Sequence, residues 1–245
     1  TIFSTPFDES AVELLENLNT PAYKIASFEL CDLPLIKLIA SKGKPILMST
    51  GMASADEISD AVITARNNGC KEILLFHCIS SYPANTEDAN LRNICFLKDE
   101  FGVEVGLSDH TKGNIAAIAS IALGATAIEK HFIIDRSDKG HDSLFSIEPK
   151  ELLELRNCTK KAWMGLGSEK LGRSKSELKN KIFRRSLYYV NSLRKGDKIK
   201  SNDIRRIRPG FGIKPKFENQ IIGKTLKRNV EKGDPVKWDT INQND

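Results

Sequence analysis

Short apolar runs alternate with amphipathic stretches along the first two thirds of the chain. Strands of a parallel sheet are buried on both faces, so their bodies are apolar. The runs with this composition span residues 2–5, 22–26, 45–49, 72–78, 104–107 and 127–132. Because helical patterns separate them at repeats of roughly 20 to 30 residues, the chain predicts six consecutive strand–helix units.

The stretches between the runs carry apolar residues at helical spacing. Ser54 with Glu57 three residues later is a capping box, which predicts that a helix begins there and runs to Asn67. Asn68 and Gly69 are a plausible end for it. The other expected helices span residues 9–17, 33–41, 90–100, 114–123 and 149–164.

Every predicted strand ends in polar, reactive residues rich in Lys, His, Ser and Thr. An open doubly wound sheet gathers its ligand groups at one switch point, whereas a (β/α)₈ barrel uses the ends of nearly all its strands. The pattern therefore favours an α/β fold of the TIM-barrel type, lacking its first two strand–helix units. The chain begins at Thr1 with a predicted strand, which suggests a truncated start.

The alternation of apolar runs and amphipathic stretches ends after residue 165. We expect a barrel domain over residues 1–165, a polar linker over 166–182 and a small second domain over 183–245. A strand is predicted over 186–190, and turns over 193–197 and 230–234 share a hydrophobic–x–Lys–Gly–Asp pattern. The predicted core of the small domain consists of Phe183, Leu187, Tyr188, Ile204, Ile207, Ile213 and Ile221.

The formal charge differs between the two parts of the chain, and the cysteine content indicates the cellular compartment. Residues 1–165 carry a formal charge of −7 and residues 166–245 carry +12, so the two parts have different surfaces. The five cysteines form no CxxC pair, which favours a reducing cytoplasm over a disulfide framework. No apolar run approaches the ~20 residues of a membrane span, and no leader pattern begins the chain.

A series of motifs follows the order of the predicted strand ends. The chain resembles the sialic acid synthase family at each of them, and Arg208-Pro209-Gly210 with Gly212-Ile213 resembles the antifreeze-like (SAF) domain of that family. The motifs are Thr5-Pro6-Phe7-Asp8, Tyr23-Lys24-Ile25-Ala26-Ser27, Ser49-Thr50-Gly51-Met52, His77-Cys78-Ile79-Ser80-Ser81-Tyr82-Pro83, Ser108-Asp109-His110-Thr111 and Ile128-Glu129-Lys130-His131-Phe132.

Two variants point to one branch of the family. Ser27-Phe28-Glu29 stands where sialic acid synthases tend to have Ser-Gly-Glu, and Ser143 stands where they tend to have a second histidine. Both resemble the pseudaminic acid synthase branch. The resemblance implies condensation of phosphoenolpyruvate with a 2,4-diacetamido-2,4,6-trideoxy hexose, releasing phosphate. A sialic acid synthase using N-acetylmannosamine is the alternative within the family.

The implied reaction demands a cationic cradle for phosphate and carboxylate. Lys24 and Lys130 supply point charges at strand ends, and Gly51 lets an anion approach the backbone. The alternative for each lysine is a surface ion pair. The residues predicted to bind phosphoenolpyruvate are Lys24, Thr50, Ser80, Ser81, Ser108 and Lys130.

The resemblance also implies a divalent metal, Mn²⁺ or Mg²⁺, acting as Lewis acid on the aldehyde. His131 is the expected ligand, with His141 standing in for the missing second histidine. His131 as a satisfied structural histidine is the alternative. Strand alternation turns Glu129 to the face opposite Lys130, where we expect an ion pair between barrel and helix.

The remaining site predictions concern protons and the sugar. Asp109, His110 and Lys130 are the catalytic candidates, the first two orienting water or taking a proton; a structural Asp–His pair is the alternative. Phe28 and Tyr82 are expected to bind the sugar. Arg208 resembles the family arginine that reaches the sugar across a dimer, which implies a domain-swapped homodimer.

Two further residues at these motifs are expected to have structural roles. Cys78 is expected to be a small buried residue in place of a nucleophile, and His77 to pack deeper in its strand.

The alternative from another functional class is a non-catalytic binding module whose basic tail binds RNA or an anionic glycan. Such a surface would interleave aromatics with its basic residues, and the tail has few. The sequence therefore predicts an enzyme with small-molecule substrates and with neither a nucleic-acid nor a membrane partner.

Overall fold

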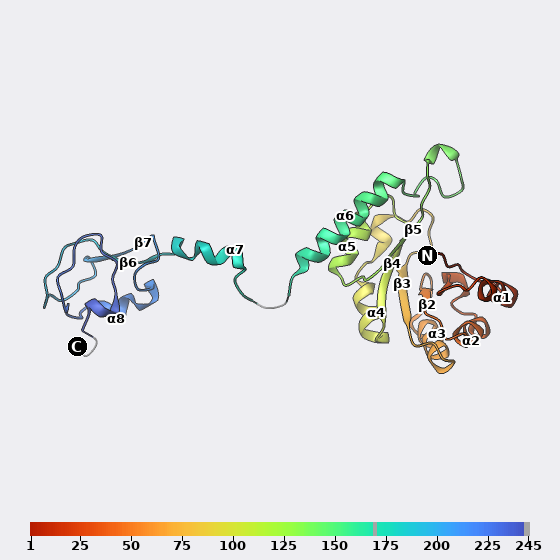
Figure 1. Cartoon of the computed structure of the whole chain (residues 1–245), viewed down its shortest axis with the longest axis horizontal. Coiled ribbons are helices and arrows are strands. Elements are labelled where there is room, and N and C mark those ends of the chain that lie inside the picture. Colours follow the sequence, from red (N-terminus) through yellow and green to blue (C-terminus); the bar gives the residue numbers. More distant parts are fainter. Residues whose placement is uncertain (169–170, 243–245) are drawn as a thin grey trace. The chain divides into compact units, whose positions relative to one another are not determined.

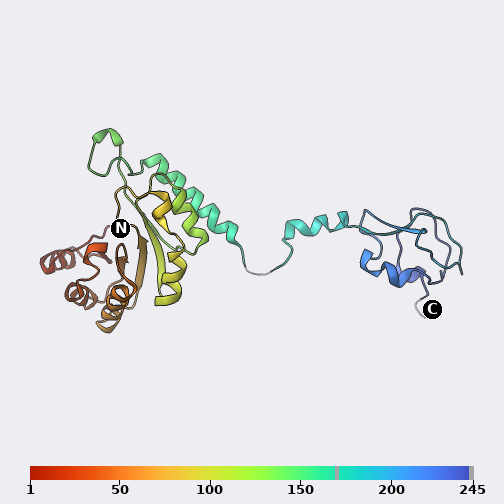
Figure 2. The ribbon, with the colours of Figure 1, turned by 180° about the vertical axis from the view of Figure 1, so that it is seen from behind.

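The computed structural model describes residues 1–168 and 171–242. Two compact units divide after residue 168. The first unit is a curled parallel sheet with helices along its outer side, and the second is a small β-rich unit (Figures 1 and 2). No helix of the described residues is long and apolar enough to cross a membrane.

The sheet of the first unit has five parallel strands that neighbour one another in chain order. A doubly wound sheet reverses its strand order at the switch point, whereas a barrel adds strands consecutively. The order therefore confirms the expectation of a partial barrel. The strands are β1 (Tyr23–Ile25), β2 (Ile46–Ser49), β3 (Ile73–Cys78), β4 (Glu104–Asp109) and β5 (Ile128–Lys130).

The first of the six predicted strands, residues 2–5, is reduced to a single parallel bridge between Ser4 and Tyr23. The Lys24 N–H donates to the Ser4 carbonyl, and Ile2 is 89 % exposed. With its apolar side chain in solvent, the segment lacks the packing that stabilises a strand. A bridge between Phe132 and Ile147 extends the parallel series past β5.

Helices begin and end near the predicted residues. The capping box at Ser54 and Glu57 is present, and the helix ends at Asn67 with Asn68 as its C-cap. Local hydrogen bonds set these boundaries, so the sequence could specify them. The helices of this unit are α1 (Glu9–Asn17), α2 (Leu33–Ala40), α3 (Ala55–Asn67), α4 (Asn93–Phe101), α5 (Ile115–Ala122) and α6 (Pro149–Leu166), with 3₁₀ turns at Ser27–Glu29, Thr86–Ala89 and Arg136–Asp138.

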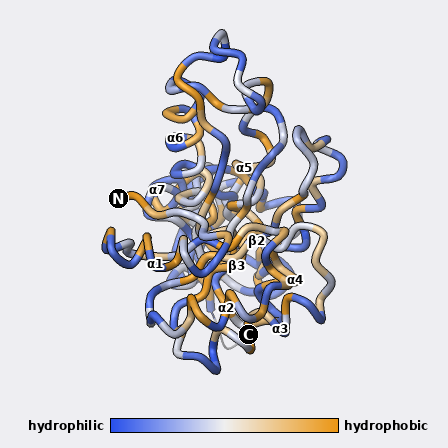
Figure 3. Tube along the Cα trace, turned by 90° about the vertical axis from the view of Figure 1, so that its right-hand side faces the viewer, coloured by the Kyte–Doolittle hydropathy of each residue, from blue (hydrophilic) through white to orange (hydrophobic). Residues whose placement is uncertain are grey.

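The core of the first unit lies between the sheet and its helices. Alternate strand residues such as Ile25, Met48 and Leu75 are fully buried there against the apolar sides of the helices. Figure 3 shows the same division as hydrophobic strands surrounded by hydrophilic loops. The other face of the sheet carries polar side chains, and these form the candidate site.

The second unit is built around an antiparallel pair, β6 (Ser186–Tyr189) and β7 (Ile204–Ile207). The two repeated turns pair with each other, because Leu193 and Val230 exchange backbone hydrogen bonds of 2.9 Å. In each turn the aspartate accepts from a backbone N–H three residues earlier. This unit also has α7 (Lys175–Leu178) and α8 (Glu218–Ile221), with 3₁₀ turns at Lys179–Phe183, Pro215–Phe217 and Trp238–Thr240.

The predicted core of this unit is partly wrong. Phe183 is 57 % exposed and Ile207 is 42 % exposed. Tyr188 is buried but lies outside the core cluster, because strand alternation directs its neighbours Leu187 and Tyr189 inward. The buried cluster is Leu187, Tyr189, Ile199, Ile204, Ile213, Ile221, Leu226, Val230, Val236 and Ile241.

The stretch expected to be a polar linker, residues 166–182, contains α7, and residues 169 and 170 of this stretch lie outside the described part of the chain. Ser174 and Glu177 form a capping box there. The Ser-x-x-Glu pattern is local, so it nucleates a helical turn in an otherwise polar segment.

Candidate active site

The polar face of the sheet brings together residues from its two edges. The Lys24 ammonium on β1 lies 3.7 Å from the Glu129 carboxylate on β5. Four inter-strand steps of roughly 4.8 Å would separate these strands in a flat sheet. The two side chains meet because the sheet curls, so they face each other across its concave face.

Hydrogen bonds organise this concave face. Lys24 Nζ donates to Ser49 Oγ at 2.6 Å and to the Ile25 carbonyl at 3.2 Å. Ser108 Oγ donates to Glu129 Oε1 at 2.7 Å. An ammonium has three N–H donors, and the 3.7 Å to Glu129 exceeds hydrogen-bond length. One donor of Lys24 is therefore available to a ligand.

Lys24 is a buried cation. Its residue is 7 % exposed. Burial lowers the pKa of the Lys24 ammonium, and the Glu129 carboxylate opposes this by favouring the charged form. An anionic ligand beside Lys24 would stabilise the cation further.

A second anion-compatible feature surrounds Gly51, just after β2. The Gly51 N–H donates to Ser27 Oγ at 3.1 Å, and Ser80 Oγ is buried without a hydrogen-bond partner among the described residues. A Cβ at position 51 would collide with both hydroxyls. Only glycine lets the two hydroxyls approach the backbone this closely, and the buried Ser80 hydroxyl keeps its hydrogen-bonding capacity for a ligand.

Three of the four hydroxyls predicted to bind phosphoenolpyruvate are already paired, Ser108 with Glu129 as described above. Thr50 Oγ1 donates to the Phe76 carbonyl at 3.0 Å, and Ser81 Oγ donates to the Pro83 carbonyl at 3.1 Å. Both would have to exchange a backbone partner for the ligand. Their predicted roles remain predictions.

Two imidazoles lie side by side at the end of β4 and β5. The ring centres of His110 and His131 are 5.2 Å apart. Tyr82 packs on His110 at 4.3 Å, and Phe145 packs on His131 at 4.9 Å. Aromatic neighbours on both rings hold the pair at the edge of the concave face.

The surroundings of these rings suit metal ligation. His110 Nδ1 lies 2.8 Å from the Ile79 carbonyl, and His131 Nδ1 lies 3.3 Å from an Asp142 oxygen. Metal-ligating histidines commonly donate one ring nitrogen to a carbonyl or carboxylate, which directs the other to the metal. Burial and the nearby His110 lower the pKa of His131, which favours the neutral form that ligates.

The described residues contain no cluster of three or more His, Cys, Asp and Glu that could hold a metal. The two imidazoles of His110 and His131 are the donors that the described residues bring together at this point. His141, the predicted partner of His131, is exposed. Its neighbour Asp142 makes the contact with His131 instead.

Cys78 also contacts this pair. Its sulfur lies 3.8 Å from His110 Nδ1, and the residue is 4 % exposed. Burial raises the pKa of the thiol, but hydrogen bonds from His110 and Ser27 outweigh it and leave the pKa below its ordinary value. Burial lowers the pKa of His110, but its hydrogen bonds with Cys78 and Ile79 raise the pKa by more, so that it lies above its ordinary value.

Lys130 and Asp109 lie on the opposite, helix-covered face of the sheet. Lys130 Nζ donates to Asp109 Oδ2 and to the Thr111 carbonyl, both at 2.7 Å, and the two side chains are 3 % and 1 % exposed. The alternation of Glu129 and Lys130 is as predicted, but the expected faces are exchanged: Glu129 meets Lys24. Alternation sets relative directions only, and the absolute phase comes from the fold.

The predicted sugar residues are solvent-accessible. Phe28 is 59 % exposed in the turn after β1, and Tyr82 is 47 % exposed against His110. Arg208 is exposed beside β7 in the second unit, followed by a cis peptide to Pro209. His77 is buried with Nε2 2.7 Å from the Ala89 carbonyl, a geometry that favours the predicted packing role.

Sequence reasoning did not select several residues that line this face. Ser27, Ser49 and Glu129 each make a contact described above, and all three stand inside the motifs quoted. Their position at strand ends was a usable signal, because successive strand ends meet at one edge. Asp142 and Phe145 come from the β5–α6 loop, and their approach to His131 depends on how that loop folds.

Comparison with known proteins covers nearly the whole chain. Pseudaminic acid synthase of Campylobacter jejuni strain 81-176 is 39 % identical over 235 residues, which are 96 % of this chain and 68 % of the relative. Pseudaminic acid synthase of Helicobacter pylori is 40 % identical over 241 residues, 98 % of this chain and 71 % of the relative. These matches confirm the branch suggested by the sequence.

A solved structure from the same family has a similar fold. N-acetylneuraminic acid synthetase from Leptospira borgpetersenii, crystallised with citrate, is 39 % identical with a TM-score of 0.69, covering 72 % of this chain and 61 % of that one. The NeuB family matches residues 1–171, and the SAF domain matches residues 184–242. Both segments were expected from the motifs, and this chain belongs to the NeuB family and carries its SAF domain.

Proposed function

We propose that the chain is a pseudaminic acid synthase-type enzyme, with residues 1–165 as its catalytic part and residues 183–245 as its SAF domain. It condenses phosphoenolpyruvate with a 2,4-diacetamido-2,4,6-trideoxy hexose to a nine-carbon nonulosonic acid. The likeness to two pseudaminic acid synthases at about 40 % identity supports this. The Lys24–Glu129 pair on the concave face, with the His110–His131 pair at the ends of β4 and β5, is the structural observation that supports it.

In the reaction, C3 of phosphoenolpyruvate bonds to the aldehyde carbon of the open-chain sugar. The aldehyde oxygen takes up a proton and becomes a hydroxyl. Water adds to C2 and loses its protons, and the C2–O bond to phosphate breaks with its electron pair going to phosphate, so that C2 becomes a ketone. Lys24 and Ser80 hold the anionic groups, because Lys24 is a buried cation and the buried Ser80 hydroxyl has no hydrogen-bond partner among the described residues. Glu129 lies beside Lys24 with a side chain 40 % exposed, placed to accept the proton of the added water.

His110 and His131 would hold the divalent metal, Mn²⁺ or Mg²⁺. When bound, the ion supplies Lewis-acid polarisation of the aldehyde oxygen. Tyr82 and Phe145 pack on the two rings and restrict their rotation. Asp142 orients His131 through Nδ1. In this arrangement Lys130 and Asp109 stabilise the strand ends from the helix side.

The direct test follows phosphate release by the protein as its gene encodes it. With phosphoenolpyruvate, the diacetamido hexose and Mn²⁺, we expect turnover that a chelator abolishes and Mn²⁺ or Mg²⁺ restores. N-acetylmannosamine replaces the hexose in the second arm. Turnover with that sugar alone would reassign the enzyme to the sialic acid synthases, and no release with either would refute the proposal.

We further propose a domain-swapped homodimer in which Arg208 of one protomer reaches the sugar of the other. The exposed guanidinium and the basic second unit support this. Mixing inactive Lys24→Met and Arg208→Ala proteins tests it, because a mixed dimer then contains one intact site. Recovery of up to about a quarter of the wild-type activity is expected from random pairing, and no recovery would contradict the arrangement.

We place the enzyme in the reducing cytoplasm. All five cysteines are unpaired, and Cys31 and Cys95 are exposed. Exposed free thiols persist in a reducing compartment and oxidise elsewhere.

A further inference from the structure

The loop of residues 131–148 between β5 and α6 brings side chains to the two-histidine pair. Asp142 approaches His131 to 3.3 Å, and Phe145 packs on the same ring while being only 3 % exposed. The tip between them is exposed, with Leu144 75 % accessible. Hydrogen bonds within the loop, such as those from the Ser146 N–H and Oγ to the Asp142 carbonyl, shape the tip. A separate restraint ties the loop to the helical layer.

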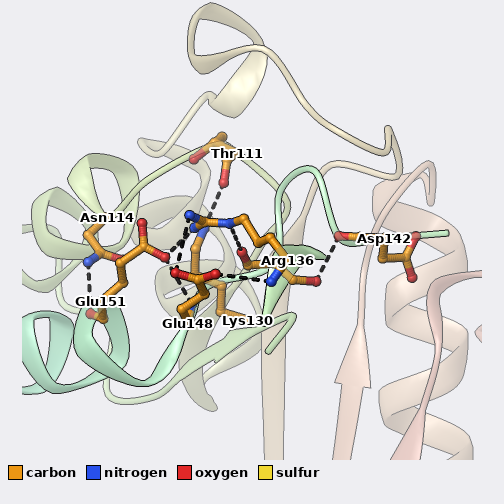
Figure 4. Close-up of polar contacts among 8 residues, drawn as sticks. Thr111, Asn114, Lys130, Arg136, Asp142, Glu148 and Glu151 are labelled. Atoms are coloured by element: carbon orange, nitrogen blue, oxygen red, sulfur yellow. Dashed lines mark hydrogen bonds and ion pairs between the residues drawn. The ribbon is translucent and has the colours of Figure 1, made fainter. Parts of the chain in front are cut away.

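Arg136 supplies that restraint (Figure 4). Its backbone N–H donates to Glu148 Oε1 at 3.0 Å, and its Nε donates to the Ser146 carbonyl at 3.0 Å. Its guanidinium also pairs with Glu151 and lies 3.8 Å from Glu148 Oε2. One side chain thus joins the outgoing limb of the loop to its returning limb and to the first turn of α6.

The acceptors of Arg136 are themselves held in place. Glu148 and Glu151 form a capping box at the start of α6, with the Glu148 N–H donating to Glu151 Oε2 at 2.9 Å. Asn114 beside α5 donates to the Glu151 carbonyl at 3.0 Å. The guanidinium is therefore fastened to the helical layer, and the loop between Arg136 and Ser146 is closed as a ring.

We propose that Arg136 is a positioning residue for the acceptor sugar, acting through the loop that carries Asp142 and Phe145. The inference rests on the proposed function. The proposed phosphoenolpyruvate contacts at Lys24 and Gly51 come from β1 and the end of β2, whereas this loop follows β5. The Asp142 carboxylate would repel that anion but accepts hydrogen bonds from a neutral sugar, so the loop belongs to the acceptor side.

The test compares Michaelis constants in the Arg136→Ala and Arg136→Lys enzymes. Loss of a residue that orients a site typically costs 10- to 100-fold in function, so we expect the acceptor KM to rise by at least about tenfold. The KM for phosphoenolpyruvate should stay within about twofold. Arg136→Lys should recover little, because an ammonium lacks the planar fork that bridges several acceptors.

A second readout does not depend on activity. Lys139 is an exposed trypsin site in the ring that Arg136 closes. We expect cleavage after Lys139 to accelerate in Arg136→Ala and in Glu151→Gln, measured by mass spectrometry on the folded proteins. Unchanged cleavage together with an unchanged acceptor KM would overturn the proposal.

Arg66 offers the matched control. Its guanidinium donates to the Phe101 and Gly102 carbonyls at 3.1 and 3.4 Å, between α3 and the end of α4. Arg66→Ala should lower the melting temperature without separating the two Michaelis constants. If the acceptor KM also rose in Arg66→Ala while the phosphoenolpyruvate KM did not, the effect of Arg136→Ala would be explained by general destabilisation. An inactive wild-type enzyme would refute the proposed function and is thereby distinguished from failure of the Arg136 inference.

Discussion

Each face of the sheet carries a lysine–carboxylate pair. The two pairs differ in the distance between their charged groups and in their exposure to solvent. Lys130 and Asp109 touch at 2.7 Å with side chains 3 % and 1 % exposed. Lys24 and Glu129 stand 3.7 Å apart, and Glu129 is 40 % exposed. In the first pair the charged groups are in direct contact and buried. In the second pair they are farther apart, and the carboxylate is accessible to a ligand. The same two functional groups thus serve stability on the helix-covered face and ligand binding on the concave face.

The largest effect should come from breaking the closed pair. Lys130→Met leaves Asp109 charged and buried without its partner, which typically costs about 3–5 kcal/mol of unfolding free energy. Urea unfolding followed by circular dichroism measures it. The double variant Lys130→Met, Asp109→Leu should recover most of the loss, because no buried charge remains. A Lys130→Met protein of normal stability would contradict the structural role.

The open pair should give a loss in catalysis of comparable size. Lys24→Met removes the donor for the anionic substrate, and loss of one such group typically lowers turnover about 10²- to 10³-fold. Steady-state phosphate release measures kcat/KM. Lys44→Met is the matched control, since Lys44 pairs with Glu16 beside β1 on the helix side. If both variants lose activity equally, the distinction between the faces fails.

The smallest effect concerns the pH dependence of stability on the helix side. Hydrogen bonds from Lys44 and from Tyr23 lower the pKa of Glu16 below its ordinary 4.5. A depressed carboxyl pKa adds stability that is fully present above the unfolded pKa and is lost as the pH falls through the folded one. Glu16→Gln should therefore flatten the acid side of the stability curve below pH 4.5, by less than about 1 kcal/mol.

Unfolding midpoints of the wild-type and Glu16→Gln proteins across pH 3 to 6 test this expectation. The difference between them should shrink as the pH falls, while phosphoenolpyruvate affinity at neutral pH stays the same. A constant difference would show that Glu16 contributes through packing and not through its charge.

Local features of the fold were predictable from the sequence. The Ser54–Glu57 capping box set a helix start, and the repeated Lys-Gly-Asp turns appeared where expected. These depend on neighbours within four residues. The consecutive strand order followed from the polar residues at every predicted strand end, because a barrel uses nearly all its strand ends and a doubly wound sheet does not.

The site was predictable only in part. Lys24 lies on the concave face and His131 beside His110, and their roles stay predictions. Glu129 and Lys130 were assigned to the wrong faces, because alternation does not reveal which face is concave. The 5.2 Å approach of His110 to His131 depends on adjacent strands being in register at Ser108 and Glu129. The ring closed by Arg136 depends on a folded loop, and no periodic pattern marks it.

The most direct test of the two-face account is the affinity of phosphoenolpyruvate for the Lys24→Met and Lys130→Met proteins, measured by isothermal titration calorimetry under conditions in which both are folded. The account predicts that Lys24→Met loses binding and that Lys130→Met binds as the wild type does. Retained binding in Lys24→Met together with lost binding in Lys130→Met would contradict it.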